Sequence, residues 1–332
     1  MNTTANLPIS LDVDDRCELA SMVRRVVRRH TGNERELFEA LDFEARNAPS
    51  ALCRFVEEYR TTGAAVSMMH IADPGDETIE FGSGSLNRFD SVLSEVAAMA
   101  YVVARLLGHP FAYGSQQGGR LVNDVTPRPE GVGINNFNGA NTAFGLHNED
   151  AIHNRRPNWV ILAGVRNNGH VPTFVSAVAP SDLRPTDWKA LREPAYIQVA
   201  NPSQGGSKLR QRLPHALVSG PVTRPTLRVN TCAMEPWQCA TRAHFEAYEM
   251  LREALERNVE KIVVGPGDVA ILNNDRVVHG RPAFSANFDG ADRLLHRIIV
   301  RTSLAELQTD LVPGTSNVLR RNEDLSEFRQ ED

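Results

Sequence analysis

Two short histidine motifs that lie far apart in the sequence restrict what this chain can fold into. The first motif contains His147 and Glu149, and the second contains His279. If residues 144–150 are extended, side-chain alternation places His147 and Glu149 on one face of a strand end. A fold that brings His279 to this strand end gathers two imidazoles and one carboxylate. Because these residues and Arg293 span positions 147 to 293, the sequence favours a single domain, 1–332.

Two histidines and one carboxylate form the ligand set of non-haem Fe(II) oxygenases. Three protein ligands on one face of an octahedron leave three positions for a chelating co-substrate and dioxygen. A histidine and a glutamate also occur at this spacing by chance, and a histidine is more often a structural side chain. Arg293, fourteen positions after His279, favours the metal interpretation, because its guanidinium could bind the distal carboxylate of 2-oxoglutarate.

The residues around these positions resemble a known family. The pattern H-x-E-x-A-x-H-x-x-R-P-x-x-V occupies residues 147–160, V-H-G-R occupies 278–281, and F-D-G-x-D-R occupies 288–293. Together they are similar to the clavaminate synthase-like group of Fe(II)/2-oxoglutarate oxygenases, over about residues 108–303. Members of this group mostly hydroxylate free amino acids such as arginine, asparagine or lysine. The resemblance implies an enzyme of natural-product or antibiotic biosynthesis that uses Fe(II), 2-oxoglutarate and O2.

The resemblance also gives roles to residues outside the metal motif. Thr173 matches a threonine that helps Arg293 hold 2-oxoglutarate, although a β-branched strand residue needs no such role. Gln116 and Asn138 match positions that face the bound amino acid. Arg297 is four residues after Arg293, so a regular strand places both on one face. Arg297 could therefore bind the carboxylate of the substrate or that of the co-substrate.

The side-chain class of the substrate follows from a departure from the family pattern. Members that take arginine or lysine have an Asp-x-Asp pair where this chain has Asn230-Thr231-Cys232. A buried cation without a carboxylate partner is costly, so we expect a free L-amino acid with an uncharged polar end, such as citrulline, asparagine or glutamine. Its amide or ureido group could exchange hydrogen bonds with Asn230, Asn138 and Gln116.

The charged ends of such a substrate need charged partners. Glu149 and Arg297 are the candidates for the α-amine and the α-carboxylate. A carboxylate from elsewhere, such as Asp124 or Asp150, would restore a lysine or arginine site. His153 is an alternative metal ligand, although the resemblance implies a structural role for it.

Other functions stay open on the sequence alone. A desaturase of the same family begins with the same hydrogen abstraction. A non-enzymatic metal-binding or sensor protein could hold an ion with the same ligands. Arg293 and a predicted lid loop at about 201–226 argue against the sensor, because a structural metal site needs neither an anion site nor a lid. Glu149 argues against a halogenase, since related halogenases have a small residue there.

The rest of the chain predicts an α+β fold with a mainly β core. We expect a double-stranded β-helix (jelly roll) with N-terminal and inserted helices. The expected segments are a loose start at 1–10, a helical scaffold within 1–62, a jelly-roll core at 63–304 and a tail at 305–332 that is loose from Thr315. Within the core, residues 159–165 suit a strand buried on both faces, 227–232 a further strand and 238–259 a long helix.

Composition restricts the partners and the location of the protein. A net charge of −5 offers no basic surface for nucleic acid. No apolar run approaches the roughly 20 residues that span a bilayer, and no signal peptide is present. We therefore expect a cytoplasmic protein that binds a small molecule, with no nucleic-acid or membrane partner; the oligomeric state is not predicted. The four cysteines form no C-x-x-C pair, which indicates reduced thiols.

Overall fold

A computed structural model describes residues 6–8, 11–30, 34–72, 95–136, 138–200 and 209–330 of the protein. Its helices are α1 (Val13–Arg29), α2 (Glu34–Glu44), α3 (Ser50–Thr62), α4 (Glu95–Leu107), α5 (Pro185–Leu191) and α6 (Arg242–Arg257). The large sheet has the spatial order β1 (Asn6–Pro8), β2 (Val66–His70), β14 (Asp268–Asn273), β6 (Trp159–Arg166), β16 (Leu294–Arg301), β3 (His109–Tyr113) and β17 (Val318–Leu319), and β4 (Asn123–Val125) also pairs with β16.

The small sheet carries His147, Thr173 and His279. Its spatial order is β13 (Glu260–Ile262), β7 (Thr173–Ser176), β15 (Val278–Arg281) and β5 (Phe144–His147), all antiparallel. Separate strand pairs are β10 (Val218–Ser219) with β11 (Thr226–Leu227), β12 (Met234–Pro236) with β8 (Tyr196–Gln198), and β18 (Phe328–Gln330) with β9 (Leu209–Gln211).

The N-terminal helices form because the sequence supplies an apolar face and suitable helix ends. In α1, Leu19, Val23 and Val26 are buried at helical spacing. The Asp12 side chain caps this helix by accepting the backbone N–H of Asp15 at 2.8 Å. The helix α4 is buried on nearly all sides and lies between the helices α1 to α3 and the large sheet. The helices α1 to α3 lie within residues 1–62, where the sequence predicts a helical scaffold, whereas α4 lies within the segment predicted as core.

Alternating apolar residues bury both faces of the large sheet. In β6, Trp159, Ile161 and Ala163 pack with the N-terminal helices, whereas Val160 and Leu162 belong to a second core shared with the small sheet. The prediction of a doubly buried strand in this region is therefore confirmed. The strand β14 alternates in the same way.

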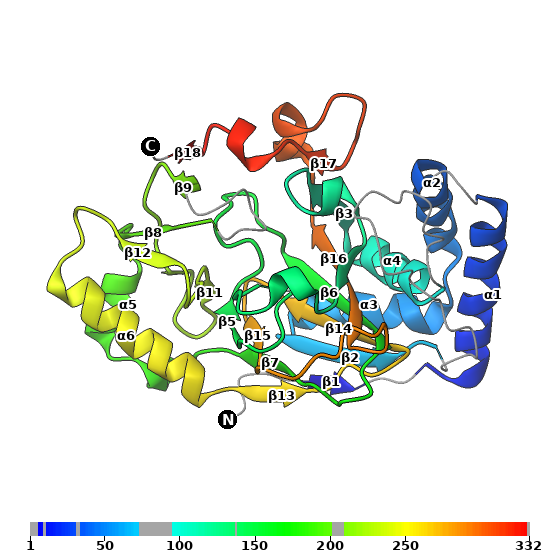
Figure 1. Ribbon diagram of the computed structural model, residues 1–332, viewed down its shortest axis with the longest axis horizontal. Coiled ribbons are helices and arrows are strands. Elements are labelled where there is room, and N and C mark those ends of the chain that lie inside the picture. The colour runs from blue at the N-terminus through cyan, green and yellow to red at the C-terminus, as the bar shows by residue number, and fades with distance from the viewer. Residues whose placement is uncertain are drawn as a thin grey trace.

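The small sheet is enclosed between the large sheet and a second group of helices. Its inner residues, such as Val175 of β7, share the core of Val160 and Leu162. On its other side, Leu146 of β5 and Val278 of β15 pack with α5 and α6. Figure 1 shows α1 to α4 at one end of the molecule and α5 and α6 at the other, with the sheets between them. The observed fold is thus a mixed helix and sheet structure.

Both chain ends differ from the expected loose segments. Residues Asn6–Pro8 pair in parallel with β2, while the rest of 1–10 lies outside the described residues. At the other end, β17 pairs with β3 and β18 pairs with β9. Leu319, Leu325 and Phe328 are buried. The expectation of a loose tail from Thr315 is wrong, because a few apolar residues within this charged segment supply a packing face.

Two further predictions need correction. The predicted strand at 227–232 is extended only at Thr226–Leu227, and Asn230 makes an isolated bridge to His147. Residues 229–231 pair with the end of β5 at this bridge, and the pairing stops there because the Asn148 side chain accepts the Val229 N–H in place of a backbone carbonyl. Of the predicted lid, residues 201–208 lie outside the described residues, and 209–226 contain β9 and β10 rather than loop alone.

Candidate metal centre

Three candidate ligands from the two histidine motifs lie together. His147 ends β5, and its Cα is paired with that of His279 across the β5–β15 ladder. Glu149 lies in the turn after β5, with its Oε2 3.5 Å from His279 Nε2. One ligand atom from each residue lies within 4.8 Å of the other two, and all three residues are buried. The structure therefore brings together the group that the motif spacing suggested.

A glycine permits the close approach of the two ligand strands. A Cβ on Gly280 would lie 2.5 Å from the backbone oxygen of Phe144. Any other residue there would push β15 away from β5. The packing of β15 against β5 therefore requires a glycine directly after His279 in the V-H-G-R motif.

The protonation states of these side chains suit a divalent metal. Burial, with a contribution from His279, lowers the pKa of His147 to about 3, so its imidazole is neutral at pH 7. His147 Nδ1 lies 2.8 Å from the Gly145 carbonyl; a proton donated there leaves the Nε2 lone pair for a metal. Burial alone would raise the pKa of Glu149, but Arg297, His279 and His147 hold it below its usual range. The donor set therefore fits Fe(II).

A pocket lies beside the three candidate ligands, between the large and small sheets. Its lining residues are Val125, Phe144, Glu149, Leu162, Thr173, His279, Gly280, Arg281, Arg293, Leu295 and Arg297.

Arg293 presents a buried positive charge to this pocket. Its Nη2 donates to Thr173 Oγ1 at 3.0 Å. Burial, with Arg281 nearby, lowers the pKa of Arg293 to about 10, so the guanidinium remains charged at pH 7. Its Nε is buried without a hydrogen-bond partner among the described residues, and no described carboxylate forms an ion pair with it. A buried cation without a counter-charge is costly, so this end of the pocket fits an anion.

Arg297 contacts a candidate metal ligand directly. Its Nη1 donates to Glu149 Oε1 at 2.7 Å, and its Nη2 donates to Gln116 Oε1 at 2.6 Å and to Asn123 Oδ1 at 2.5 Å. The sequence predicts a carboxylate partner for Arg297 from the substrate or the co-substrate. The structure shows that Glu149 already provides one.

The remaining predicted substrate residues take different positions. Gln116 is buried, and its Nε2 donates to Asp150 Oδ1 at 2.5 Å. Asn230 is buried beside His147, and its Oδ1 accepts the Cys232 N–H at 3.1 Å. The Oδ1 atom of Asn138 is buried and has no hydrogen-bond partner within the described residues. Gln116, Asn138 and Asn230 are not among the residues that line the pocket.

His153 lies outside the ligand group. Its Nδ1 is 3.0 Å from Glu327 Oε1, and its ring stacks on Tyr113 with centroids 4.0 Å apart. It connects the C-terminal segment to the turn that follows Glu149. The structural interpretation of His153 therefore agrees with the structure.

The role of Arg281, which lies two residues after His279, is not predicted from the sequence. Its guanidinium is buried and donates to a set of backbone carbonyls, those of Asn136, Gly139, Ala140, Thr142 and Pro282. Arg281 thereby fixes the asparagine-rich loop before β5 onto β15. Its place in the V-H-G-R motif was the only sequence feature that could indicate this role. Its partners are backbone carbonyls, and these do not depend on which residue types occupy positions 136–142.

None of the helices in the described part of the chain combines the length and the apolarity of a bilayer-spanning helix.

Comparisons with known proteins agree with this site. Residues 86–299 match the model of the family described as taurine catabolism dioxygenase TauD, TfdA family. Enduracididine beta-hydroxylase of Streptomyces hygroscopicus is 26% identical over 94% of this chain and 99% of its own length. The solved structure of asparagine oxygenase with Fe(II), 3-hydroxyasparagine and succinate has a TM-score of 0.83 and 26% identity, over 94% of this chain and 99% of that one.

A second solved structure, the non-heme iron oxygenase OrfP with Fe and α-ketoglutaric acid, has a TM-score of 0.84 and 25% identity. The match covers 94% of this chain and 100% of that one. These relatives confirm the resemblance that the sequence motifs suggested.

Proposed function

This chain belongs to the TauD, TfdA family of dioxygenases, and we propose that it hydroxylates a side-chain carbon of a free L-amino acid. As a member of this family it is an enzyme that depends on Fe(II), 2-oxoglutarate and O2. The observation that carries the proposal is the buried His147, Glu149 and His279 group beside a pocket lined by Arg293, which has no carboxylate partner among the described residues. The alternative of a metal sensor explains the ligands but leaves that arginine without a purpose.

The proposed roles follow from the positions of the side chains. His147, Glu149 and His279 would bind iron on one face and leave the opposite face for 2-oxoglutarate and O2. Iron bound there would activate O2 with two electrons from 2-oxoglutarate, so that one oxygen atom converts C–H to C–OH and the other enters succinate, with release of carbon dioxide. Arg293, with Thr173, would bind the distal carboxylate of 2-oxoglutarate.

The fold and cellular role are part of the same proposal. We infer that the two facing sheets form a double-stranded β-helix within a single domain, because solved oxygenases superpose on most of the chain. The name of one relative that matches over 94% of this chain, enduracididine beta-hydroxylase, favours a role in natural-product biosynthesis.

We propose that the substrate side chain ends in an uncharged polar group. Among the described residues that line the pocket, Glu149 supplies the carboxylate, and Arg297 already neutralises it. Asp150 accepts a hydrogen bond from Gln116, and Asp124 pairs with His296 at 3.1 Å and with Arg120 at 3.4 Å. Neither aspartate lines the pocket. Among the described residues, a cationic side chain would therefore find no further carboxylate in the pocket lining, whereas an amide or a ureido group needs only hydrogen bonds.

Substrate turnover is the direct test. The enzyme with Fe(II), 2-oxoglutarate and ascorbate should convert citrulline, asparagine or glutamine into a product heavier by one oxygen atom, detected by mass spectrometry. All proteinogenic amino acids, ornithine and enduracididine are included in the screen. Preferred turnover of arginine, lysine or enduracididine, with the amides and citrulline inert, would contradict the uncharged class but not the iron site. A product lighter by two hydrogen atoms would indicate a desaturase.

The role of Arg293 gives a second prediction. An Arg293→Lys enzyme should show a KM for 2-oxoglutarate raised by about 10- to 100-fold, because losing one charge-assisted hydrogen bond costs roughly 1.5–3 kcal/mol. The KM for the amino acid should change much less. Thr173→Val, which removes only the hydroxyl that contacts Arg293, is the milder companion variant. If Arg293→Lys instead weakens amino-acid binding and spares 2-oxoglutarate, Arg293 belongs to the substrate site.

A further inference from the structure

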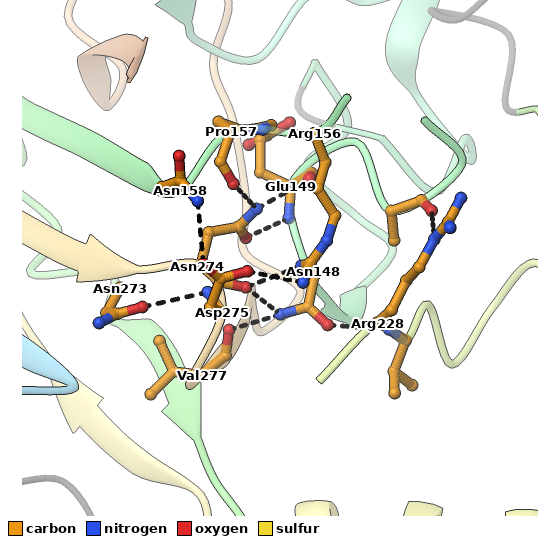
Figure 2. A network of polar contacts seen from close by, with 12 residues as sticks. Asn148, Glu149, Arg156, Pro157, Asn158, Arg228, Asn273, Asn274, Asp275 and Val277 are labelled. Carbon is orange, nitrogen blue, oxygen red and sulfur yellow. Dashed lines mark hydrogen bonds and ion pairs between the residues drawn. The ribbon is translucent and has the colours of Figure 1, made fainter. Parts of the chain in front are cut away.

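Glu149 lies beyond the last paired residue of β5, so the β5–β15 ladder does not fix it. The turn is irregular, with a φ of 48° at Asp150. The Asn274 side chain replaces the missing strand neighbour: its Oδ1 accepts the Glu149 N–H at 2.7 Å, and its Nδ2 donates to the Glu149 carbonyl at 3.0 Å (Figure 2). The same Nδ2 donates to the Pro157 carbonyl at 2.9 Å. Asn274 is 1% exposed.

Asn148 makes the reciprocal contact. This residue separates His147 from Glu149, and it is also 1% exposed. Its Nδ2 donates to the carbonyls of Asn274 at 2.7 Å and Val277 at 2.9 Å (Figure 2). These carbonyls lie at the two ends of the turn that connects β14 to β15, the strand of His279. Each side chain therefore holds the backbone of the segment that bears the other.

Neighbouring residues keep Asn274 in place. Its backbone N–H donates to the Asn158 carbonyl at 2.8 Å. Its carbonyl also accepts a hydrogen bond from Arg156 Nη1 at 3.0 Å, and Arg156 Nη2 contacts Asp275 Oδ1 at 2.7 Å. The amide that contacts Glu149 consequently extends from a fixed backbone, as Figure 2 shows.

We propose that Asn148 and Asn274 are positioning residues that set the placement of Glu149 relative to His279 before the metal binds. The inference rests on the proposed metal centre. Strand register already fixes the two histidines relative to each other. Arg297 holds the Glu149 carboxylate, whereas the Glu149 backbone, which lies beyond the ladder, is held by Asn274. Preorganised ligands bind a metal more tightly because less order must be imposed on binding. Loss of an outer partner of a metal ligand typically weakens metal affinity 10–100-fold.

Another buried asparagine supplies a matched control. Asn167 Oδ1 accepts the Val171 N–H at 2.9 Å, and its Nδ2 donates to the carbonyls of Val171 at 3.0 Å and Val264 at 3.1 Å. It is 2% exposed. Asn167 thus makes the same three kinds of hydrogen bond as Asn274, in a turn without a proposed metal ligand.

The test compares the Mn(II) dissociation constant with the stability of the metal-free protein, by anaerobic calorimetric titration and thermal unfolding. Asn148→Ala and Asn274→Ala should weaken Mn(II) binding about 10–100-fold. Asn167→Ala should lower the unfolding temperature to a similar degree while leaving the Mn(II) affinity close to that of the wild type. Asn274→Asp keeps the shape and the acceptor but loses both donors, so it should weaken Mn(II) binding even if the alanine variant folds poorly.

Two results would overturn the inference. One is wild-type Mn(II) affinity in folded Asn274→Asp or Asn148→Ala. The other is an equal loss of affinity in Asn167→Ala, which would indicate a general effect of buried asparagines. Failure of the proposed function is distinguishable, because the wild-type protein itself would then bind no Mn(II) in a manner that depends on His279.

Discussion

Replacing His279 by alanine is expected to remove both metal binding and turnover. His279 faces His147 across the β5–β15 ladder, and its Nε2 lies 3.5 Å from Glu149 Oε2. The variant retains only two of the three ligands, so its metal affinity should fall by more than the roughly 10–100-fold caused by losing an outer partner. Since iron carries the oxygen chemistry, hydroxylation should fall to background. Mn(II) titration and product detection measure the two effects separately.

His153→Ala is the appropriate control for this variant. His153 is also buried and belongs to the same sequence motif, but its partner is Glu327. This variant should lose stability and keep its metal affinity. Full activity in His279→Ala would exclude His279 from the site. Loss of metal binding in His153→Ala alone would give the third ligand position to His153.

The sequence predicted those parts of the fold in which one periodic pattern determines the structure. The helix α1 lies within the predicted helical scaffold and has buried residues at helical spacing. The strand β6 alternates between two cores and therefore appears as a continuous apolar run. In both elements, burial on a regular backbone leaves a direct trace in residue type.

The sequence did not predict segments whose partners are distant backbone groups. The strand expected at 227–232 pairs with β5 only at the His147–Asn230 bridge, because the Asn148 side chain accepts the Val229 N–H in place of a backbone carbonyl. The C-terminal segment packs through a few apolar residues, and its Glu327 reaches His153, which is 174 positions away. Contacts of this kind depend on the tertiary arrangement, and neither composition nor periodicity encodes them.

The candidate site shows the same division. Motif spacing was enough to group His147, Glu149 and His279, and the structure places them together. In contrast, the sequence motif presents Asn148 only as the residue between two ligands, and no sequence pattern distinguishes Asn274. Their importance lies in amide contacts to backbone atoms. The residue between two ligands of a motif can therefore be as restricted in residue type as the ligands themselves.

Replacing Arg297 by methionine is expected to destabilise the metal-free protein by about 3–5 kcal/mol. The Arg297 and Glu149 side chains are 7% and 8% exposed, and Nη1 lies 2.7 Å from Oε1. Methionine leaves a buried carboxylate without its cation, and it leaves the side-chain oxygens of Gln116 and Asn123 without the Nη2 donor. Breaking one side of such a pair costs more than the pair contributes, because the remaining charge stays buried. Chemical denaturation of the metal-free protein measures the free energy of unfolding.

The surface pair of Arg24 and Glu95 is a control that distinguishes the effect of burial on the free energy of unfolding from the effect of the distance between the charges. Arg24 Nε also lies 2.7 Å from its carboxylate partner, but these side chains are 57% and 28% exposed. Arg24→Met should therefore change the free energy of unfolding by only about 0–1 kcal/mol. Arg297→Lys, which retains the charge but cannot reach Glu149, Gln116 and Asn123 together, should lie between the two. Equal small losses in Arg297→Met and Arg24→Met would show that Glu149 does not depend on Arg297.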